Sequence, residues 1–114
     1  MKLLIVDDNA DTRRLIRAMV RPWSDDIIEG RNGEEAVASY TLHRPDWVLM
    51  DVEMHDMDGI AAARIIRQRD PTARIIMVTT FDDPRLRSAA EKVGASGYVL
   101  KDNLMELQSL LKRQ

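Results

Sequence analysis

Polar side chains that could bind a metal ion and a phosphate follow four of the short apolar runs in this sequence. Asp7 and Asp8 follow the first run, and Asp51 follows the third. Thr79 follows the fourth run, and Lys101 follows the fifth. If the runs are parallel strands, these side chains meet beyond the carboxyl edge of one sheet, where open α/β sheets bind their ligands.

Three carboxylates at one crevice repel one another by several kcal/mol when the site is partly dry. A proton on one carboxylate or a bound divalent cation would relieve that repulsion. Mg²⁺ takes oxygen ligands and commonly uses one or two carboxylates together with waters and phosphate. No His or Cys accompanies the acidic residues, which disfavours Zn²⁺. The pattern therefore favours a magnesium site.

A lysine beside these carboxylates has two interpretations. Lys101 could form a plain ion pair. With a metal ion present, Lys101 and Thr79 would instead form a seat for a tetrahedral oxyanion, and Asp51 could attack a phosphoryl group as a nucleophile. Phosphoryl transfer requires mainly positioning and charge neutralisation, which these residues could supply.

The elements that must position these residues alternate along the chain. Apolar runs without strict alternation predict parallel strands covered on both faces, at residues 2–6, 26–29, 46–50, 74–78 and 98–100. Helical patterns separate and follow them: one after Asn9 that Pro22 ends, then 33–43, 58–69, one capped by Asp82 or Asp83, and one after Asn103. This βαβαβαβαβα order predicts a doubly wound α/β fold.

Two helices carry more specific predictions. Leu15, Ile16, Met19 and Val20 are expected to form the buried face of the first helix, while its arginines form a solvated face. In the last helix, Asn103 and Glu106 have the spacing of a capping box.

Composition limits the classes of function. The 114 residues fit one domain, residues 1–114. The net charge of -2 gives no global basic field, so we expect no direct binding of nucleic acid or membrane. The chain has no cysteine, which excludes a catalytic thiol or disulfide framework and fits a cytoplasmic location. No apolar run approaches the roughly 20 residues of a membrane span.

Five blocks, in this order and spacing, resemble the receiver domain of two-component response regulators over essentially the whole chain. They are residues 4–9 (LIVDDN), 48–54 (VLMDVEM), 57–59 (MDG), 76–80 (IMVTT) and 94–101 (GASGYVLK). The resemblance implies a flavodoxin-like fold, with a five-stranded parallel sheet of order 2-1-3-4-5 and five helices.

The resemblance also implies roles for single residues. Asp51 would accept the phosphoryl group, Lys101 would pair with the acyl phosphate, and Thr79 would move toward it. Tyr98 would turn inward behind Thr79 as the second switch residue. The metal site would be Mg²⁺ held by the residues Asp8, Asp51, the backbone carbonyl of Glu53 and, through water, Asp7.

The implied function is a signalling switch and not an enzyme with an external product. The partner would be a sensor histidine kinase or a phosphotransfer protein, and phosphorylation could bring about a homodimer. Residues 79–83 and 97–102 look closest to receivers that precede a helix-turn-helix output domain. His55 and Asp102 depart from the family, which often has proline at both places, so we expect a trans bond after Lys101.

Two other interpretations stay open at this point. A pseudo-receiver would bind a partner without phosphorylation, although all the expected side chains are present. A hydrolase with an aspartyl-phosphate intermediate usually has a second Asp two residues after the nucleophile, where this chain has Glu53.

Overall fold

The computed structural model describes residues 1–112, in which five strands and five α-helices alternate. The strands are β1 (Lys2–Val6), β2 (Asp26–Gly30), β3 (Trp47–Asp51), β4 (Ile75–Thr79) and β5 (Gly97–Leu100). The helices are α1 (Ala10–Val20), α2 (Gly33–His43), α3 (Gly59–Arg69), α4 (Pro84–Lys92) and α5 (Glu106–Leu111). A 3₁₀ turn, η1 (Lys101–Asn103), joins β5 to α5.

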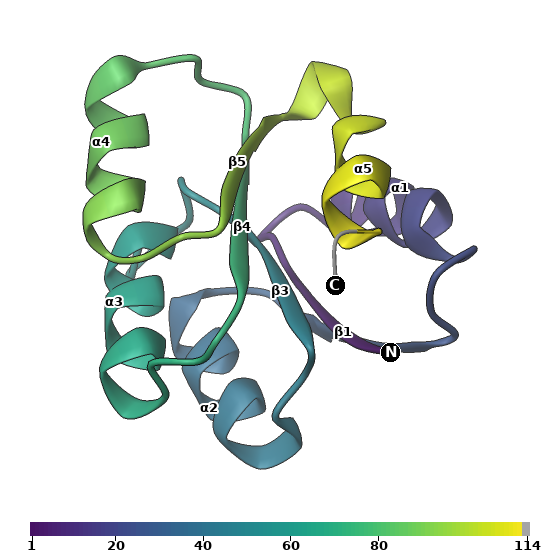
Figure 1. Cartoon of the computed structure of the whole chain (residues 1–114), viewed down its shortest axis with the longest axis horizontal. Coiled ribbons are helices and arrows are strands. Elements are labelled where there is room, and N and C mark those ends of the chain that lie inside the picture. The colour runs from purple at the N-terminus through teal and green to yellow at the C-terminus, as the bar shows by residue number, and fades with distance from the viewer. Residues whose placement is uncertain (113–114) are drawn as a thin grey trace.

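The strands form one parallel sheet in the order β2-β1-β3-β4-β5, as predicted. Helices α1 and α5 cover one face, and α2, α3 and α4 cover the other (Figure 1). Each face has its own apolar core, one centred on Leu4, Met50 and Ile66 and the other on Ile5, Leu49 and Leu107. The chain order reverses beside β1 and β3, so the switch point of the fold lies between these two strands.

The two inner strands β3 and β4 are buried along their whole length, which explains why their sequences lack alternation. Strand β3 begins one residue later than predicted and includes Asp51 as its last residue. Strand β4 likewise ends on Thr79. Both polar side chains are therefore held by the sheet itself and not by a loop that follows it.

The caps predicted for the first and fourth helices are confirmed, and Asp58, which was predicted to lie inside the third helix, is its N-cap. The Asn9 side chain accepts a hydrogen bond from the Thr12 N–H at 3.0 Å, and Asp58 accepts one from the Ala61 N–H at 2.8 Å. Asp83, not Asp82, caps α4. Gly94 follows this helix with φ of 89°, the left-handed conformation that favours glycine.

Two predictions about the helices are wrong. Leu15 is 54% exposed, because it lies one position away from the stripe of Ile16 and Val20 that packs on the sheet. Asn103 does not cap the last helix; α5 begins at Glu106 without a side-chain cap, because η1 takes up the residues before it. The Asn103 side chain donates instead to the Glu106 carboxylate at 3.5 Å.

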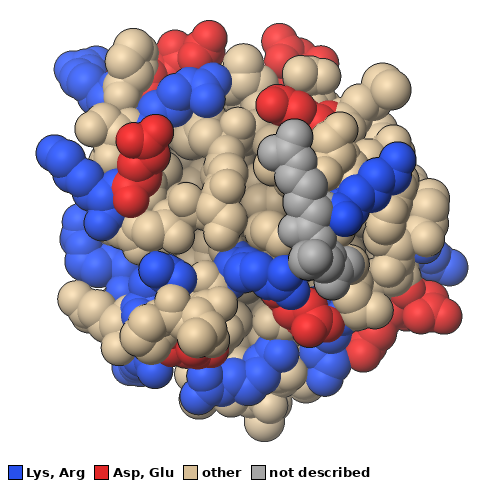
Figure 2. All heavy atoms as spheres, viewed as in Figure 1, with Lys and Arg blue, Asp and Glu red and all other residues tan. Residues whose placement is uncertain are grey.

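The described surface carries charges of both signs. Figure 2 shows both basic and acidic side chains on one face of the molecule. No helix within residues 1–112 is long and apolar enough to cross a membrane. The same residues contain no cis peptide bond, which confirms the trans bond expected after Lys101.

Candidate functional site

Three carboxylates meet at the carboxyl ends of β1 and β3, as the sequence predicted. Asp7, Asp8 and Asp51 each offer an oxygen, and these oxygens lie within 4.8 Å of one another. Asp7 and Asp51 are buried, whereas Asp8 is exposed. The cluster is thus open to solvent on the Asp8 side and closed beneath.

Lys101 reaches this cluster from the end of β5. Its Nζ lies 2.8 Å from Asp7 Oδ2 and 3.2 Å from Asp51 Oδ2. Burial alone would lower the pKa of Lys101, but its close ion-pair contact with Asp7 and the charges of Asp51 and Asp7 raise the pKa above its ordinary value. The lysine therefore stays protonated and neutralises part of the cluster's charge.

Asp51 is buried, with 5% of its surface exposed. Burial raises its pKa from 3.8 to about 6, and the nearby Asp7 charge adds to this, while Lys101 opposes it. The Glu53 N–H donates to Asp51 Oδ1 at 3.3 Å. A second positive charge at the site would favour the ionised carboxylate, which is the form that can act as a nucleophile.

Backbone and side-chain contacts fix the position of Asp7. Its N–H donates to the Gly30 carbonyl at 3.1 Å, which extends the pairing of β1 with β2 by one residue. Its Oδ1 accepts from the Asn9 N–H at 2.9 Å. Its carbonyl accepts from Arg13 Nη1 at 2.7 Å. Asp7 is therefore held at both ends of its backbone as well as at its carboxylate.

A glycine beneath Asp51 permits the loop to turn back against the strand end. The Gly59 N–H donates to the Val52 carbonyl at 2.8 Å. A Cβ at Gly59 would lie 2.9 Å from the Asp51 carbonyl carbon and still closer to its oxygen. Only a residue without a side chain fits there, so Gly59 allows α3 to start directly behind Asp51.

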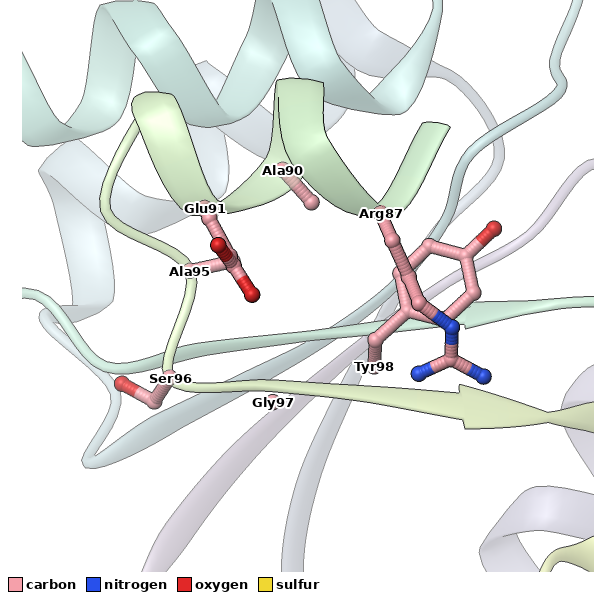
Figure 3. Close-up of a pocket in the computed structure, with 7 residues that line it drawn as sticks. All are labelled: Arg87, Ala90, Glu91, Ala95, Ser96, Gly97 and Tyr98. Carbon is pink, nitrogen blue, oxygen red and sulfur yellow. The ribbon is translucent and has the colours of Figure 1, made fainter. Parts of the chain in front are cut away.

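The two predicted switch residues are linked through Phe81. Thr79 is fully buried, and its Oγ1 accepts from the Phe81 N–H at 3.2 Å. The Tyr98 hydroxyl donates to the Phe81 carbonyl at 2.7 Å. The Arg87 guanidinium lies over the Tyr98 ring, 4.5 Å from its centre (Figure 3). One peptide segment thus touches both Thr79 and Tyr98.

The chemistry of the acidic cluster fits Mg²⁺. All candidate ligands are oxygens, and one carboxylate is exposed enough to leave room for water ligands. Asp7 Oδ2 forms the ion pair with Lys101 but, among the described residues, accepts no hydrogen bond of good geometry. A buried carboxylate oxygen with spare acceptor capacity is suited to a nearby cation or its water shell.

Sequence analysis missed two residues that support the site. Arg13 was assigned to a solvated helix face, but its side chain is only 13% exposed and contacts Asp7. Arg14, its neighbour, is 75% exposed and does fit that assignment. Gly59 was noticed as part of a block, yet its contact with Asp51 depends on tertiary structure. No sequence signal separates Arg13 from Arg14, except that Arg13 lies one turn from Arg17 on the face toward β2.

Curated relatives share most of this chain. A chemotaxis protein CheY from Bacillus subtilis is 39% identical over 101 residues, which is 88% of this chain and 84% of the relative. The transcriptional regulatory protein LnrK from the same organism is 36% identical over 90% of this chain, but this chain spans only 47% of LnrK.

Solved structures share the fold. A chain in the crystal structure of the CheX-CheY-BeF3-Mg+2 complex from Borrelia burgdorferi superimposes with a TM-score of 0.89 and 26% identity, and the match covers 100% of this chain and 90% of that one. A LuxR-family DNA-binding response regulator from Staphylococcus aureus gives a TM-score of 0.88 with 26% identity, and the match covers 99% of this chain and 98% of that one.

The fold and the acidic edge define a doubly wound domain of the signal-receiving class. The profile of the response regulator receiver domain matches residues 3–112. The chain belongs to this family.

Proposed function

We propose that this chain is a phospho-accepting signalling switch, with residues 1–114 forming one receiver domain. Its phosphoryl donor is a phosphohistidine on a sensor kinase or a phosphotransfer protein, and its acceptor is Asp51. The observation that supports this most strongly is the position of Lys101, whose ammonium contacts Asp7 and Asp51 at the mouth of an acidic, oxygen-only site.

Magnesium would be held by Asp8, Asp51 and the Glu53 carbonyl, with Asp7 acting through water. When bound, the ion supplies positive charge to the phosphoryl oxygens and to the attacking carboxylate. The residues of the chain supply the nucleophile and its positioning. Asp51 offers the nucleophilic oxygen, and the buried strand end beneath it limits its rotation.

The transfer is a single displacement at phosphorus. An oxygen–phosphorus bond forms to Asp51 while the phosphorus–nitrogen bond of the donor breaks, and the bonding pair leaves with the imidazole, which takes up a proton. Lys101 balances the charge that remains on the new acyl phosphate. Thr79 offers a hydroxyl hydrogen bond from the end of β4, the neighbouring strand.

The output of the switch is a changed surface. The Thr79 hydroxyl would leave the Phe81 N–H for the phosphate, and the Phe81 peptide would then release Tyr98 to turn inward. This is a two-state element biased by a local change in charge. The domain catalyses its own phosphorylation and dephosphorylation and nothing else.

The wider assembly is also part of the proposal. LnrK is a transcriptional regulator about twice as long as the matched region, and the Staphylococcus aureus relative is described as DNA-binding. Their likeness supports a receiver of the subgroup that precedes a helix-turn-helix domain. In that arrangement phosphorylation favours a homodimer, the receiver itself does not touch DNA, and the protein works in the cytoplasm.

Intact-mass measurement tests the proposal. The chain is incubated with acetyl phosphate, with and without Mg²⁺, beside an Asp51→Ala variant. We expect the wild-type protein to gain one phosphoryl group when both acetyl phosphate and Mg²⁺ are present and none when Mg²⁺ is left out. We expect no added group in Asp51→Ala under either condition. A pseudo-receiver would instead show no adduct with any donor and would bind its partner equally well after Asp51→Ala.

A further inference from the structure

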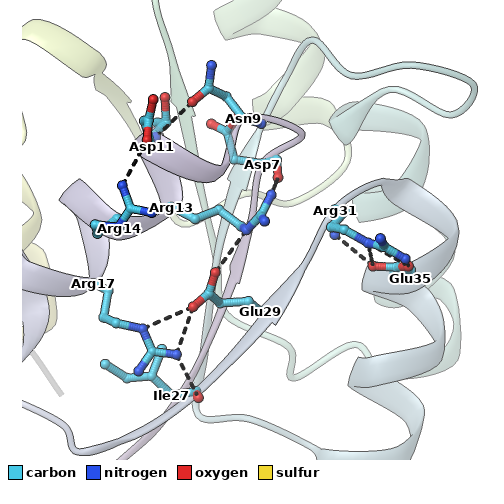
Figure 4. Close-up of polar contacts among 11 residues, drawn as sticks. Asp7, Asn9, Asp11, Arg13, Arg14, Arg17, Ile27, Glu29, Arg31 and Glu35 are labelled. Atoms are coloured by element: carbon cyan, nitrogen blue, oxygen red, sulfur yellow. Dashed lines mark hydrogen bonds and ion pairs between the residues drawn. The ribbon is translucent and has the colours of Figure 1, made fainter.

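The peptide group that joins Asp7 to Asp8 is held by an arginine. Arg13 Nη1 donates a hydrogen bond to the Asp7 carbonyl at 2.7 Å (Figure 4). A peptide unit is planar, so this carbonyl and the Asp8 N–H lie in the same rigid peptide plane. The contact with Arg13 therefore fixes the direction in which the chain leaves Asp7 and enters Asp8.

Asp8 has little support of its own. Within the described residues, the ion-pair contact of its carboxylate is to the His55 ring, whose Nε2 lies 3.9 Å away on a side chain that is 91% exposed. Asp7, in contrast, is held through its N–H by the Gly30 carbonyl. The orientation of the Asp8 carboxylate consequently depends on the backbone, and Arg13 holds the backbone on that side.

Arg13 is itself held in place by the second strand. Its Nε donates to Glu29 Oε1 at 2.8 Å, and its side chain is 13% exposed. Glu29 also pairs through Oε2 with Arg17 Nη2 at 2.8 Å. Figure 4 shows the two arginines, which lie one turn apart on α1, converging on Glu29. The planar guanidinium of Arg13 spans from Glu29 on β2 to the end of β1, which a lysine ammonium cannot do.

We propose that Arg13 is a positioning residue of the metal site, acting through the Asp7–Asp8 peptide to orient Asp8. This inference rests on the proposed function, because it concerns the Mg²⁺ site. Positioning and charge make opposite predictions here. A cation near the site repels Mg²⁺, so loss of charge alone would strengthen Mg²⁺ binding, whereas loss of positioning weakens it.

Arg17 provides the matched control for this test. It shares helix α1, the same charge and the same Glu29 partner, but its other contact is to the Ile27 carbonyl at 3.5 Å and not to Asp7. The experiment measures Mg²⁺ affinity of the whole chain by titration calorimetry for wild type, Arg13→Gln, Arg13→Lys and Arg17→Gln. Thermal unfolding of each variant is recorded to confirm that it is folded.

We expect Arg13→Gln to weaken Mg²⁺ binding about tenfold, the lower end of the effect of removing an outer contact from a metal ligand. Arg13→Lys should weaken it similarly although the charge is kept. Arg17→Gln should leave the Mg²⁺ affinity within about twofold of wild type, because Arg13 still holds the Asp7 carbonyl in this variant. In metal-free protein, the amide signal of Asp8 should move in both Arg13 variants and not in Arg17→Gln.

The experiment distinguishes a failure of the positioning role of Arg13 from a failure of the proposed function. Unchanged or tighter Mg²⁺ binding in Arg13→Gln, or equal weakening in Arg17→Gln, would overturn the positioning role while leaving the proposed function intact. A wild-type chain that binds no Mg²⁺ would overturn the proposed function itself. If Arg13→Gln does not fold, Arg13→Lys gives the answer, and normal affinity in that variant would count against the inference.

Discussion

Gly59 offers the most direct structural perturbation of the site without changing any charged group. A Cβ there would lie 2.9 Å from the Asp51 carbonyl carbon, closer still to its oxygen, and 3.0 Å from Met77 Cε. Real Cβ atoms essentially never come closer than 3.0 Å to another heavy atom, so the backbone must shift. We therefore predict that Gly59→Ala displaces the end of β3 and destabilises the protein.

The size of the effect follows from what must give way. Met77 Cε is the end of a flexible side chain and can move at low cost. The Asp51 carbonyl belongs to the central buried strand and cannot. Overpacking of this kind costs typically 1–3 kcal/mol and occasionally more, so we expect about 3 kcal/mol. For a domain of this size that corresponds to a fall in melting temperature on the order of 12 °C.

Gly30→Ala is the matched control. A Cβ at Gly30 would lie 3.5 Å from Val6 Cγ2 and 3.6 Å from Glu35 Cβ, which are ordinary contacts. Alanine at a compatible glycine position is neutral or stabilising by about 0.4–1 kcal/mol, because the unfolded chain loses conformational freedom. Urea unfolding gives both free energies, and labelling with acetyl phosphate and Mg²⁺ gives the functional effect.

We expect Gly59→Ala to lose both stability and labelling, and Gly30→Ala to keep both. If Gly59→Ala unfolded within about 1 kcal/mol of wild type and accepted phosphate at the normal rate, the close approach of α3 to Asp51 would be irrelevant to the site. Our account of how the fold positions the acceptor would then be wrong.

Three further perturbations test the electrostatics and the switch. Lys101→Met leaves two buried carboxylates without their cation, so metal-free protein should lose roughly 3 kcal/mol of stability at neutral pH in urea unfolding, and an unchanged value would contradict the ion pairs. Because burial raises the pKa of Asp51 from 3.8 to about 6, the folded protein binds this proton more tightly than the unfolded chain, and metal-free stability should fall as pH rises from about 4 to about 6. Denaturant melts of wild type and Asp51→Asn across that range would show the difference, and parallel curves would refute the raised pKa. Tyr98→Phe removes one half-exposed hydrogen bond to Phe81 but keeps the ring beneath Arg87, so the stability should change by less than about 1 kcal/mol; a larger loss in urea melts would mean that the hydroxyl anchors the fold.

Much of this fold could be predicted from the sequence because its signals are local. The buried runs 48–50 and 76–78 lack polar residues, so they had to be covered on both faces. Asn9 and Asp83 cap helices through their own side chains, an interaction that a few neighbouring residues decide. The site residues followed from the same pattern, since strand ends of a parallel sheet share one edge.

The errors come from interactions that the local sequence does not contain. Asn103 has the right spacing for a cap, but the 3₁₀ turn that follows β5 delays the start of the helix by two residues, from 104 to Glu106. Leu15 is apolar and near the buried stripe, yet the direction of α1 on the sheet points it to solvent. Arg13 and Arg14 are equivalent in sequence, and only the position of Glu29 on β2 distinguishes their environments.

A crystal structure of the chain soaked with Mg²⁺ and beryllofluoride would test the central claim most directly. The account predicts an ion on the carboxylates of Asp8 and Asp51 and a BeF3 group whose beryllium is bonded to an Asp51 carboxylate oxygen, with Lys101 Nζ and Thr79 Oγ1 turned toward the fluorides. An ion bound away from this edge, or a beryllofluoride site that Lys101 does not contact, would contradict it.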